Sequence, residues 1–262
     1  MRQNLRKTLI LVLGLVLLIS VSVSVFFRVQ KLQSSKNQEE AQEIVSVEPP
    51  PEPEEEVVEE VVEIDPYVEV LREIDRAALQ AVNDDVIGWI TIPDTQLSYP
   101  IMYSGDNSYY LTHTWDKQYN SAGSVFLEQH CSPDLSDFNT ILYGHRMRDG
   151  SIFGSLRDYA ETSHWEQHPY IYVCNAEGFY RYEIFSIYEA SVKGSTYRLA
   201  LTEPEEQQAF LDDCTGWSTI ETGVVPTLED RILTLSTCTG RGYDTRWVVQ
   251  ARLSPDGIFP NN

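Results

Sequence analysis

Cysteine and basic residues are scarce in this chain of 262 residues. Its four cysteines are too sparse for a disulfide scaffold, and no two of them stand in a Cys-x-x-Cys pair, so the sequence supports neither a zinc knuckle nor a thioredoxin motif. Only 19 Lys and Arg residues stand against 40 Asp and Glu residues, which gives a net charge of −21. Because non-specific nucleic-acid binding needs a basic surface, we expect no nucleic-acid partner. A composition with 42% hydrophobic residues also excludes disorder throughout the chain.

The charges divide the chain into three unlike parts. Residues 1–36 carry basic residues and no acidic one, whereas residues 37–65 carry acidic residues and no basic one. Residues 66–262 carry both signs and are the only part long enough to bury a sizeable core. A chain of this length has room for one or two domains, and we expect one folded domain at residues 65–262.

The long hydrophobic run at residues 8–27 contains no charged residue. As a helix it would span about 30 Å, the thickness of the hydrocarbon layer of a membrane. A cleaved signal peptide is the alternative, although its apolar core is usually shorter. We expect a transmembrane anchor at residues 8–27 and a cytoplasmic basic tail at residues 1–7. Basic residues flank the run equally, and the amino terminus favours an orientation with the N-terminus inside.

The segment between the anchor and the domain, residues 28–64, is rich in Glu and Pro in its second half. Like charges repel and extend such a chain, and it has too few apolar residues to form a core. We therefore expect a disordered acidic and proline-rich stalk that holds the domain away from the membrane. A solvated tail without a function is the alternative.

The folded domain begins with a helical pattern at Asp65-Pro66. Asp at the N-cap and Pro at the first helical position start a helix, and apolar residues recur at helical spacing as far as Asn83. The pattern then shortens to alternating runs separated by glycine and proline, which predicts a mainly β domain with one closed or sandwiched β-structure and peripheral helices. The expected strands are residues 87–92, 97–102, 124–127, 140–145, 170–174, 179–192, 231–238 and 246–253, and further helices are expected at residues 107–111, 153–159, 163–167 and 203–214.

Cys238 ends one expected strand, and Arg246 begins the next after a glycine-rich loop. If these strands pair antiparallel, the two side chains lie at the same end of the sheet and within reach of each other. Alternation places Cys238 on the same face as Ser236. A guanidinium beside a thiol favours the thiolate and can bind the oxyanion that forms when the thiolate attacks a carbonyl. A structural cysteine with a surface arginine is the alternative, and Arg241 in the loop is a second candidate arginine.

A thiolate that transfers acyl groups also needs a proton donor for the leaving amine, and His145 is the candidate. It stands at the end of an alternating strand and shares a face with Tyr143. Gly144, just before it, lets a ligand or another backbone segment approach closely.

The other histidines are weaker candidates. His164 and His168 have a spacing that could bind a metal ion on a helix, but no third ligand is evident and Pro169 ends the helix. We therefore expect no metal site. His113 and His130 stand in loop-like contexts and are expected at the surface.

Two motifs resemble those of a known family. Thr234-Leu-Ser-Thr-Cys238 resembles the TLxTC signature of sortases, and Tyr143-Gly-His145 with residues 146–156 resembles the sortase histidine segment in its class B form. Arg246 occupies the place of the family's arginine. The resemblance extends from about residue 65 to residue 253, and the helix before the first strand and the extra helix at residues 203–214 also resemble class B.

This resemblance implies a cysteine transpeptidase, without a cofactor, on a closed sortase-type β-barrel of about eight strands. It implies that Cys238 attacks the carbonyl of Thr in a C-terminal sorting signal, that a thioacyl enzyme forms, and that His145 supplies the proton to the leaving tail. Arg246 would bind the substrate backbone or the oxyanion. Ser236, Tyr143 and Thr237 would bind substrate beside the cleft.

The same resemblance implies the partners. These are secreted proteins with an Asn-Pro-x-Thr-x-like or related sorting pentapeptide, and an amine of a peptidoglycan precursor or a pilin as acceptor. The enzyme would be held in the membrane of a Gram-positive-type cell by residues 8–27, with its catalytic domain outside. Two alternatives remain open, a hydrolytic cysteine peptidase with the same residues and a catalytically silent peptide-binding module on the same barrel.

Overall fold

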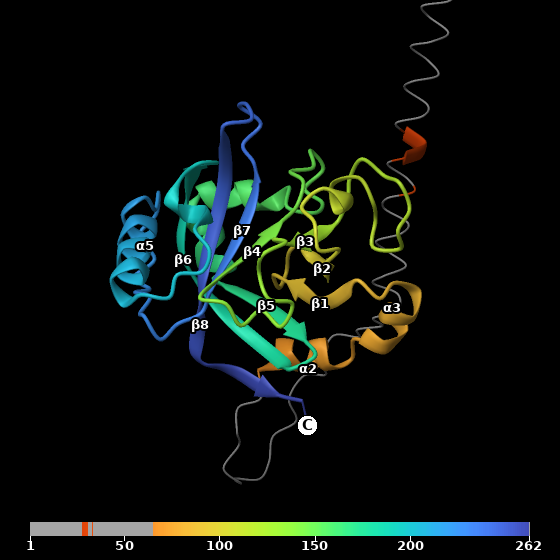
Figure 1. Cartoon of the computed structure of the whole chain (residues 1–262), viewed down its shortest axis with the longest axis horizontal. Coiled ribbons are helices and arrows are strands. Elements are labelled where there is room, and N and C mark those ends of the chain that lie inside the picture. The colour runs from red at the N-terminus through yellow and green to blue at the C-terminus, as the bar shows by residue number, and fades with distance from the viewer. Residues whose placement is uncertain (1–27, 31–32, 34–64, 262) are drawn as a thin grey trace, which may run out of the picture.

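The computed structural model describes residues 28–30, 33 and 65–261, and its elements are labelled in Figure 1. The predicted tail at residues 1–7, the predicted anchor at residues 8–27 and nearly all of the predicted stalk lie outside the described residues, so they stay predictions. Within the described residues, no helix has both the length and the apolar character needed to cross a membrane.

The first helical stretch consists of two helices, α2 at Pro66–Arg72 and α3 at Arg76–Val82. Asp65 and Asp75 each accept a hydrogen bond from a backbone N–H of the helix that follows. The prediction of a single helix is wrong because Asp75 caps a new helix and Ile74, just before it, turns into the core, where it is 7% exposed. The two short helices pack against one end of the barrel (Figure 1).

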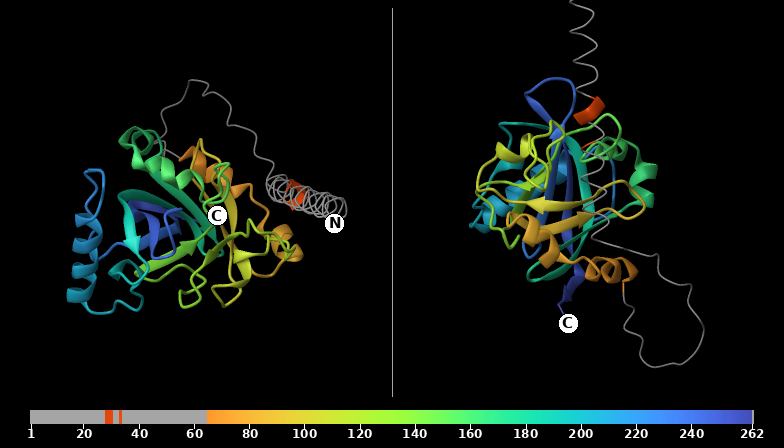
Figure 2. Two further views of the ribbon diagram at one scale, coloured as in Figure 1. Left: turned by 90° about the horizontal axis from the view of Figure 1, so that it is seen from above. Right: turned by 90° about the vertical axis from the view of Figure 1, so that its right-hand side faces the viewer.

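Eight strands close into a barrel in the order β1-β2-β3-β4-β7-β8-β6-β5, which confirms the expected closed β-structure. Neighbours are antiparallel except for β2 with β3 and β4 with β7. Figure 2 shows α5, the long helix at Pro204–Gly216, against one outer side of the barrel. The strands are β1 Val86–Thr91, β2 Ser98–Met102, β3 Val125–Leu127, β4 Asn139–Tyr143, β5 Tyr170–Asn175, β6 Gly178–Ser191, β7 Ile232–Cys238 and β8 Thr245–Pro260, and the shorter helices are η1 Tyr109–Leu111, η2 Ser155–Ala160, α4 Thr162–Gln167 and η3 Ser195–Tyr197.

Two strands end more than one residue away from the predicted position. β4 ends at Tyr143, so His145 lies two residues beyond the strand rather than within it. β8 does not end at Leu253 but continues to Pro260. Residues 254–257 contain Ser, Pro, Asp and Gly, which are typical of a turn, but the strand bends at an irregularity in its register with β6 and then resumes its pairing.

The mainly polar face of β7 and β8 is buried beneath α5 and η3, while Leu235 and its neighbours on the other face point into the barrel. Thr234 and Gln250 are fully buried. The Thr234 hydroxyl donates to Asn139 Oδ1 at 2.7 Å and accepts from Gln250 Nε2 at 3.0 Å. Tyr188 donates to Gln250 Oε1 at 3.0 Å, so these buried polar groups satisfy one another.

This network predicts a measurable cost for an isosteric change. Thr234→Val removes one hydroxyl and leaves a buried amide oxygen and a buried amide nitrogen each short of a partner. The free energy of unfolding should fall by about 1–3 kcal/mol in urea titrations. A Thr202→Val variant, changed at an exposed loop position, is the matched control. A loss at position 234 no larger than that of the control would contradict the network's role.

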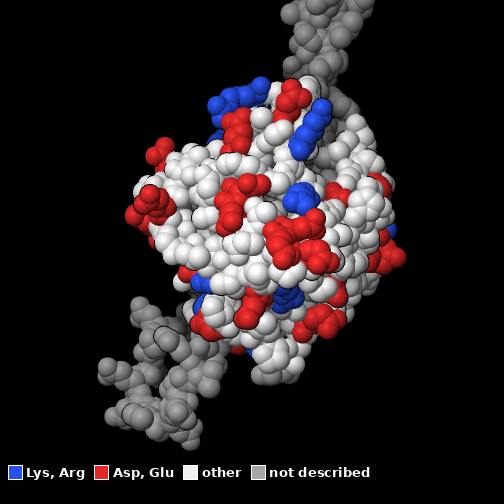
Figure 3. All heavy atoms as spheres, turned by 60° about the vertical axis from the view of Figure 1, so that its left-hand side comes forward, with Lys and Arg blue, Asp and Glu red and all other residues white. Residues whose placement is uncertain are grey.

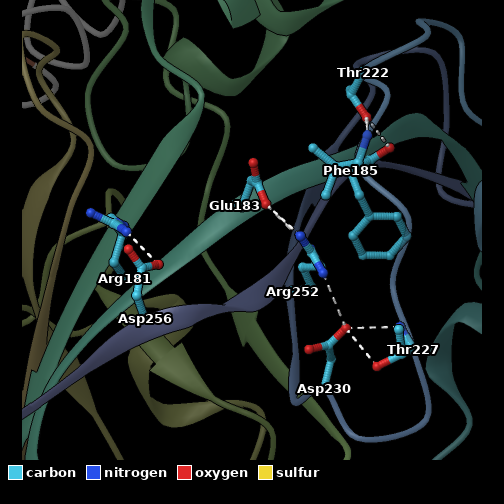
Figure 4. A network of polar contacts seen from close by, with 9 residues as sticks. Arg181, Glu183, Phe185, Thr222, Thr227, Asp230, Arg252 and Asp256 are labelled. Atoms are coloured by element: carbon cyan, nitrogen blue, oxygen red, sulfur yellow. Dashed lines mark hydrogen bonds and ion pairs between the residues drawn. The ribbon is translucent and has the colours of Figure 1, made fainter.

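Ion pairs hold the end of the β7–β8 hairpin opposite to Cys238 (Figure 4). Arg252 of β8 contacts Glu183 of β6 at 2.9 Å and Asp230, which precedes β7, at 3.6 Å. Arg181 of β6 contacts Asp256 at 2.6 Å. These contacts tie β6, β8 and the entry to β7 together, so the far end of the hairpin is fixed independently of the end that carries the cysteine.

Acidic side chains predominate over basic ones on the face that carries α5 (Figure 3). Glu205, Asp212 and Asp213 of this helix are exposed. This face therefore offers no basic surface of the kind that nucleic-acid binding requires.

Candidate active site

A pocket of about 360 Å³ lies where β4 and β7 end. Segments far apart in sequence meet there, from the loop before η1 to the start of β8. All six residues that the sequence predicted for the site line this pocket, and they are Cys238, His145, Arg246, Ser236, Tyr143 and Thr237.

The parallel pairing of β4 with β7 brings His145 and Cys238 together. Tyr143 pairs with Ser236 in this register, and His145 and Cys238 each stand two residues further along. Paired strands lie about 4.8 Å apart, so the two residues occupy matching positions on adjacent segments. Thr237 strengthens the junction, because its hydroxyl donates to the backbone carbonyl of the residue before His145 at 2.7 Å.

Cys238 differs from the other cysteines in its exposure. All four cysteines are free thiols, but only Cys238 is partly exposed. Burial raises the pKa of the Cys131 and Cys174 thiols to about 12 and that of Cys214 to about 11. Because the thiolate is the nucleophilic form, these three cysteines are chemically inert, and Cys238 is the available nucleophile.

The ring of His145 is oriented by a backbone contact. Its Nε2 lies 2.8 Å from the carbonyl oxygen of Leu111. A carbonyl can only accept, so Nε2 carries a proton and Nδ1 is the nitrogen left for proton transfer. Gly144 lines the pocket, and a β-carbon at this position would meet the side chains of Ile152 and Phe153 at 2.9 Å, so the glycine also leaves room for these two side chains.

Arg246 lies directly opposite Cys238 in the antiparallel pairing of β7 with β8. Its Nη1 donates to the carbonyl oxygens of Tyr243 and Thr245, both at 2.9 Å, which fixes the guanidinium at the edge of the pocket. Arg241, the second candidate, does not line the pocket, and its side chain is 72% exposed in an ion pair with Glu189. The geometry therefore favours Arg246.

Two sets of polar contacts at the pocket, one with two members and one with three, were not predicted from the sequence. Tyr197 of η3 forms a hydrogen bond of 2.9 Å with Ser236. The buried carboxylate of Glu128 accepts from Tyr143 at 3.0 Å and from the Asn107 amide at 2.5 Å. Burial raises the pKa of Tyr143, and the charge of Glu128 adds to this, so the phenol stays a neutral donor. A carboxylate at the end of an apolar strand was the one signal in the sequence that could have pointed to this wall.

The remaining histidines lie away from this pocket. The rings of His164 and His168 are 4.7 Å apart, but His168 Nδ1 contacts the Pro93 carbonyl oxygen at 3.0 Å. In the part of the chain that the structure describes, no group of three or more His, Cys, Asp and Glu side chains could hold a metal ion. His130 is exposed as predicted, whereas His113 is half-buried, because its ring stacks on a neighbouring tyrosine with centroids 4.0 Å apart.

Comparisons with known proteins agree with this geometry. The model of the sortase domain family matches residues 90–254. Sortase B of Listeria monocytogenes is 37% identical over 177 residues, which cover 67% of this chain and 72% of that protein. The Staphylococcus aureus sortase B–substrate complex superposes with a TM-score of 0.65 at 33% identity, over 68% of this chain and 83% of that one. A sortase B complexed with triglycine matches equally well, with a TM-score of 0.65 at 33% identity over 68% of this chain and 84% of that one.

Proposed function

Because this chain belongs to the sortase family of cysteine transpeptidases, with sortase B proteins among its relatives, we propose that it cleaves a C-terminal sorting signal through Cys238 and joins the product to an amine. The observation that carries the proposal is the parallel register of β4 with β7, which sets His145 beside Cys238 in one pocket. The thiol is partly exposed there, and it faces a guanidinium across the β7–β8 pair.

In the first half-reaction the Cys238 sulfur, as thiolate, attacks the carbonyl carbon of the threonine in the signal. A tetrahedral intermediate forms, and its carbon–nitrogen bond breaks to leave a thioester on the enzyme. The departing amine takes its proton from the protonated His145 ring, at Nδ1, because Nε2 is bonded to the Leu111 carbonyl. The tail leaves, and His145 is left neutral.

Arg246 stabilises the negative charge that develops on the carbonyl oxygen in this step. Only its Nη1 is used in the two bonds to loop carbonyls, so Nε and Nη2 make no hydrogen bond within the described residues. These N–H groups stabilise the oxyanion of the tetrahedral intermediate or hold the substrate backbone. Ser236, Tyr143 and Thr237 shape the pocket around the peptide.

In the second half-reaction an acceptor amine attacks the thioester carbonyl. Neutral His145 accepts a proton from the attacking amine, an amide bond forms, and the thiolate of Cys238 is released. The sortase B complexed with triglycine supports an amine of peptide type as the acceptor. The acceptor is an amine of a peptidoglycan precursor or of a pilin, and the donors are secreted proteins with an Asn-Pro-x-Thr-x-like signal.

The proposed location is the cell membrane. Residues 8–27 anchor the chain as a single span with its N-terminus inside, and the stalk presents the catalytic domain outside. Enzyme and substrate then share one membrane surface, which raises their effective concentration.

Product analysis tests this function. The purified chain is incubated with peptides carrying Asn-Pro-x-Thr-Asn, Asn-Pro-x-Thr-Gly, Leu-Pro-x-Thr-Gly or Pro-Pro-x-Thr-Gly signals, with and without diaminopimelate or oligoglycine. A new peptide–amine conjugate is the expected product, formed at the expense of the free acid as the amine is raised. Free acid alone, at every amine concentration, would indicate a hydrolytic peptidase. No reaction with any peptide would contradict catalysis of these signals.

Arg246→Lys keeps the positive charge and loses the planar fork of donors. We expect kcat/KM for the sorting peptide to fall by about ten-fold or more, because a lysine cannot hold the loop carbonyls and the oxyanion together. Arg241→Lys, changed outside the pocket, is the control and should retain the wild-type value. Equal activity of Arg246→Lys and the wild type would show that Arg246 supplies charge only.

A further inference from the structure

The segments that carry His145 and Cys238 stop pairing with each other just before these two residues. The register of β4 with β7 runs as far as Tyr143 and Ser236. Beyond that point, the backbone bond from Gly144 N to Ser236 O is already long, at 3.4 Å. Past this point Cys238 stays paired with Arg246 of β8, and the His145 carbonyl oxygen accepts from the Phe153 N–H at 3.0 Å. Between the two segments themselves, however, the remaining contacts are made by side chains.

Arg146 makes such a contact. Its Nη1 donates to the backbone carbonyl oxygen of Thr239 at 2.7 Å. Arg146 follows His145 and Thr239 follows Cys238, so this bond joins matching positions one step past the pair. A charged donor to a carbonyl is stronger than a neutral one, and the bond takes the place of the missing backbone ladder.

Gly240, in the loop after Cys238, leaves space for the Arg146 side chain because it has no β-carbon. Its φ is +77°, a conformation that L side chains rarely adopt. A β-carbon there would stand 2.9 Å from Nη2 and 3.2 Å from Cζ of Arg146. The Arg146 guanidinium thus packs directly against the backbone of Gly240, and the β-carbon of any other residue at position 240 would clash with it.

We propose that Arg146 is a positioning residue, which clamps the chain after Cys238 to the chain after His145 and so holds the thiol in line with the imidazole. It acts through these two residues and needs no contact with substrate. The inference rests on the proposed function, since the pair that Arg146 aligns is the proposed catalytic pair.

Alkylation of the full chain by iodoacetamide tests the clamp without any peptide, so its result does not depend on which signal or acceptor the enzyme uses. Because the other three cysteines are buried, a folded barrel is labelled once, at Cys238. We expect Arg146→Met to slow this labelling at pH 7 by about five-fold or more. The rate should match that of His145→Ala, because the first variant moves the imidazole out of line with the thiol and the second removes the imidazole. Arg148→Met, at an exposed arginine two residues along, should label like the wild type. Wild-type labelling of Arg146→Met, or equal slowing by Arg148→Met, would overturn the proposal.

Two further variants keep the test decisive. Arg146→Lys retains a donor and should recover part of the labelling rate. Gly240→Ala displaces the guanidinium and, because φ at this position is +77°, also strains the loop, so it should slow labelling at least as much as Arg146→Met. The double variant should be slowed by less than the product of the two single effects, since both substitutions break the same contact. Effects that multiply fully, or labelling of all four cysteines in Arg146→Met, would show that Arg146 supports the fold rather than the alignment. With an active peptide, the clamp predicts a fall in kcat at nearly unchanged KM for Arg146→Met.

Discussion

Cys238→Ala should abolish both acylation and transfer while the barrel stays folded. No other described cysteine can replace the thiol, because Cys131, Cys174 and Cys214 are buried. Cys238 ends its strand and is partly exposed, so losing one sulfur should cost less than about 1 kcal/mol of folding free energy. Peptide turnover by mass spectrometry and urea unfolding measure the two effects on the same preparation.

Cys131→Ala is the matched control for this prediction. It removes a sulfur that is 3% exposed and lies near the carbonyl of Asn139, so it should lower stability and leave turnover of the folded enzyme unchanged. Residual turnover by Cys238→Ala would refute its assignment as the nucleophile, and unfolding of that variant would assign the cysteine a structural role.

His145→Ala should lower kcat by about 10²–10⁴-fold, the range that a lost general acid accounts for. The variant removes the proton donor of the first half-reaction and the acceptor of the second. Binding of the sorting peptide, measured in a Cys238→Ala background, should fall much less than kcat, because His145→Ala removes only one of the side chains that line the pocket. Free imidazole should restore part of the rate, because it can replace the missing proton donor. It could not restore activity that was lost through misfolding of the variant.

His130→Ala serves as the control for that loss. This histidine is exposed and does not line the pocket, so its removal should leave kcat at the wild-type value. A His145→Ala enzyme that turns over at the wild-type rate would refute the assignment of His145 as the acid.

Alternation along the chain was enough to locate all eight strands, because one face of each strand packs into the barrel. The same alternation placed Cys238 and Ser236 on one face, and the short loop before Arg246 implied the hairpin that sets it opposite the cysteine. These features are local, so the sequence alone could specify them.

Features that depend on tertiary contacts were predicted poorly. The break before Asp75 follows from Ile74 turning into the core, and the length of β8 follows from its pairing with the start of β6. Tyr197 and Asn107 reach the pocket from segments without a motif, and only the folded chain brings them beside the strands. The pairing of β4 with β7, between which β5 and β6 intervene in the sequence, could not be derived from either strand alone.

Rapid-quench intact-mass analysis of the full chain with a sorting peptide tests the central claim most directly. We expect a mass increase equal to the signal's N-terminal fragment in thioester linkage, located at Cys238 by peptide mapping. The adduct should decay faster as an acceptor amine is raised, while the peptide–amine conjugate appears at the same rate. Peptide cleavage without an adduct would contradict the thioacyl-enzyme mechanism. An adduct whose decay rate does not depend on the amine concentration would contradict transpeptidation.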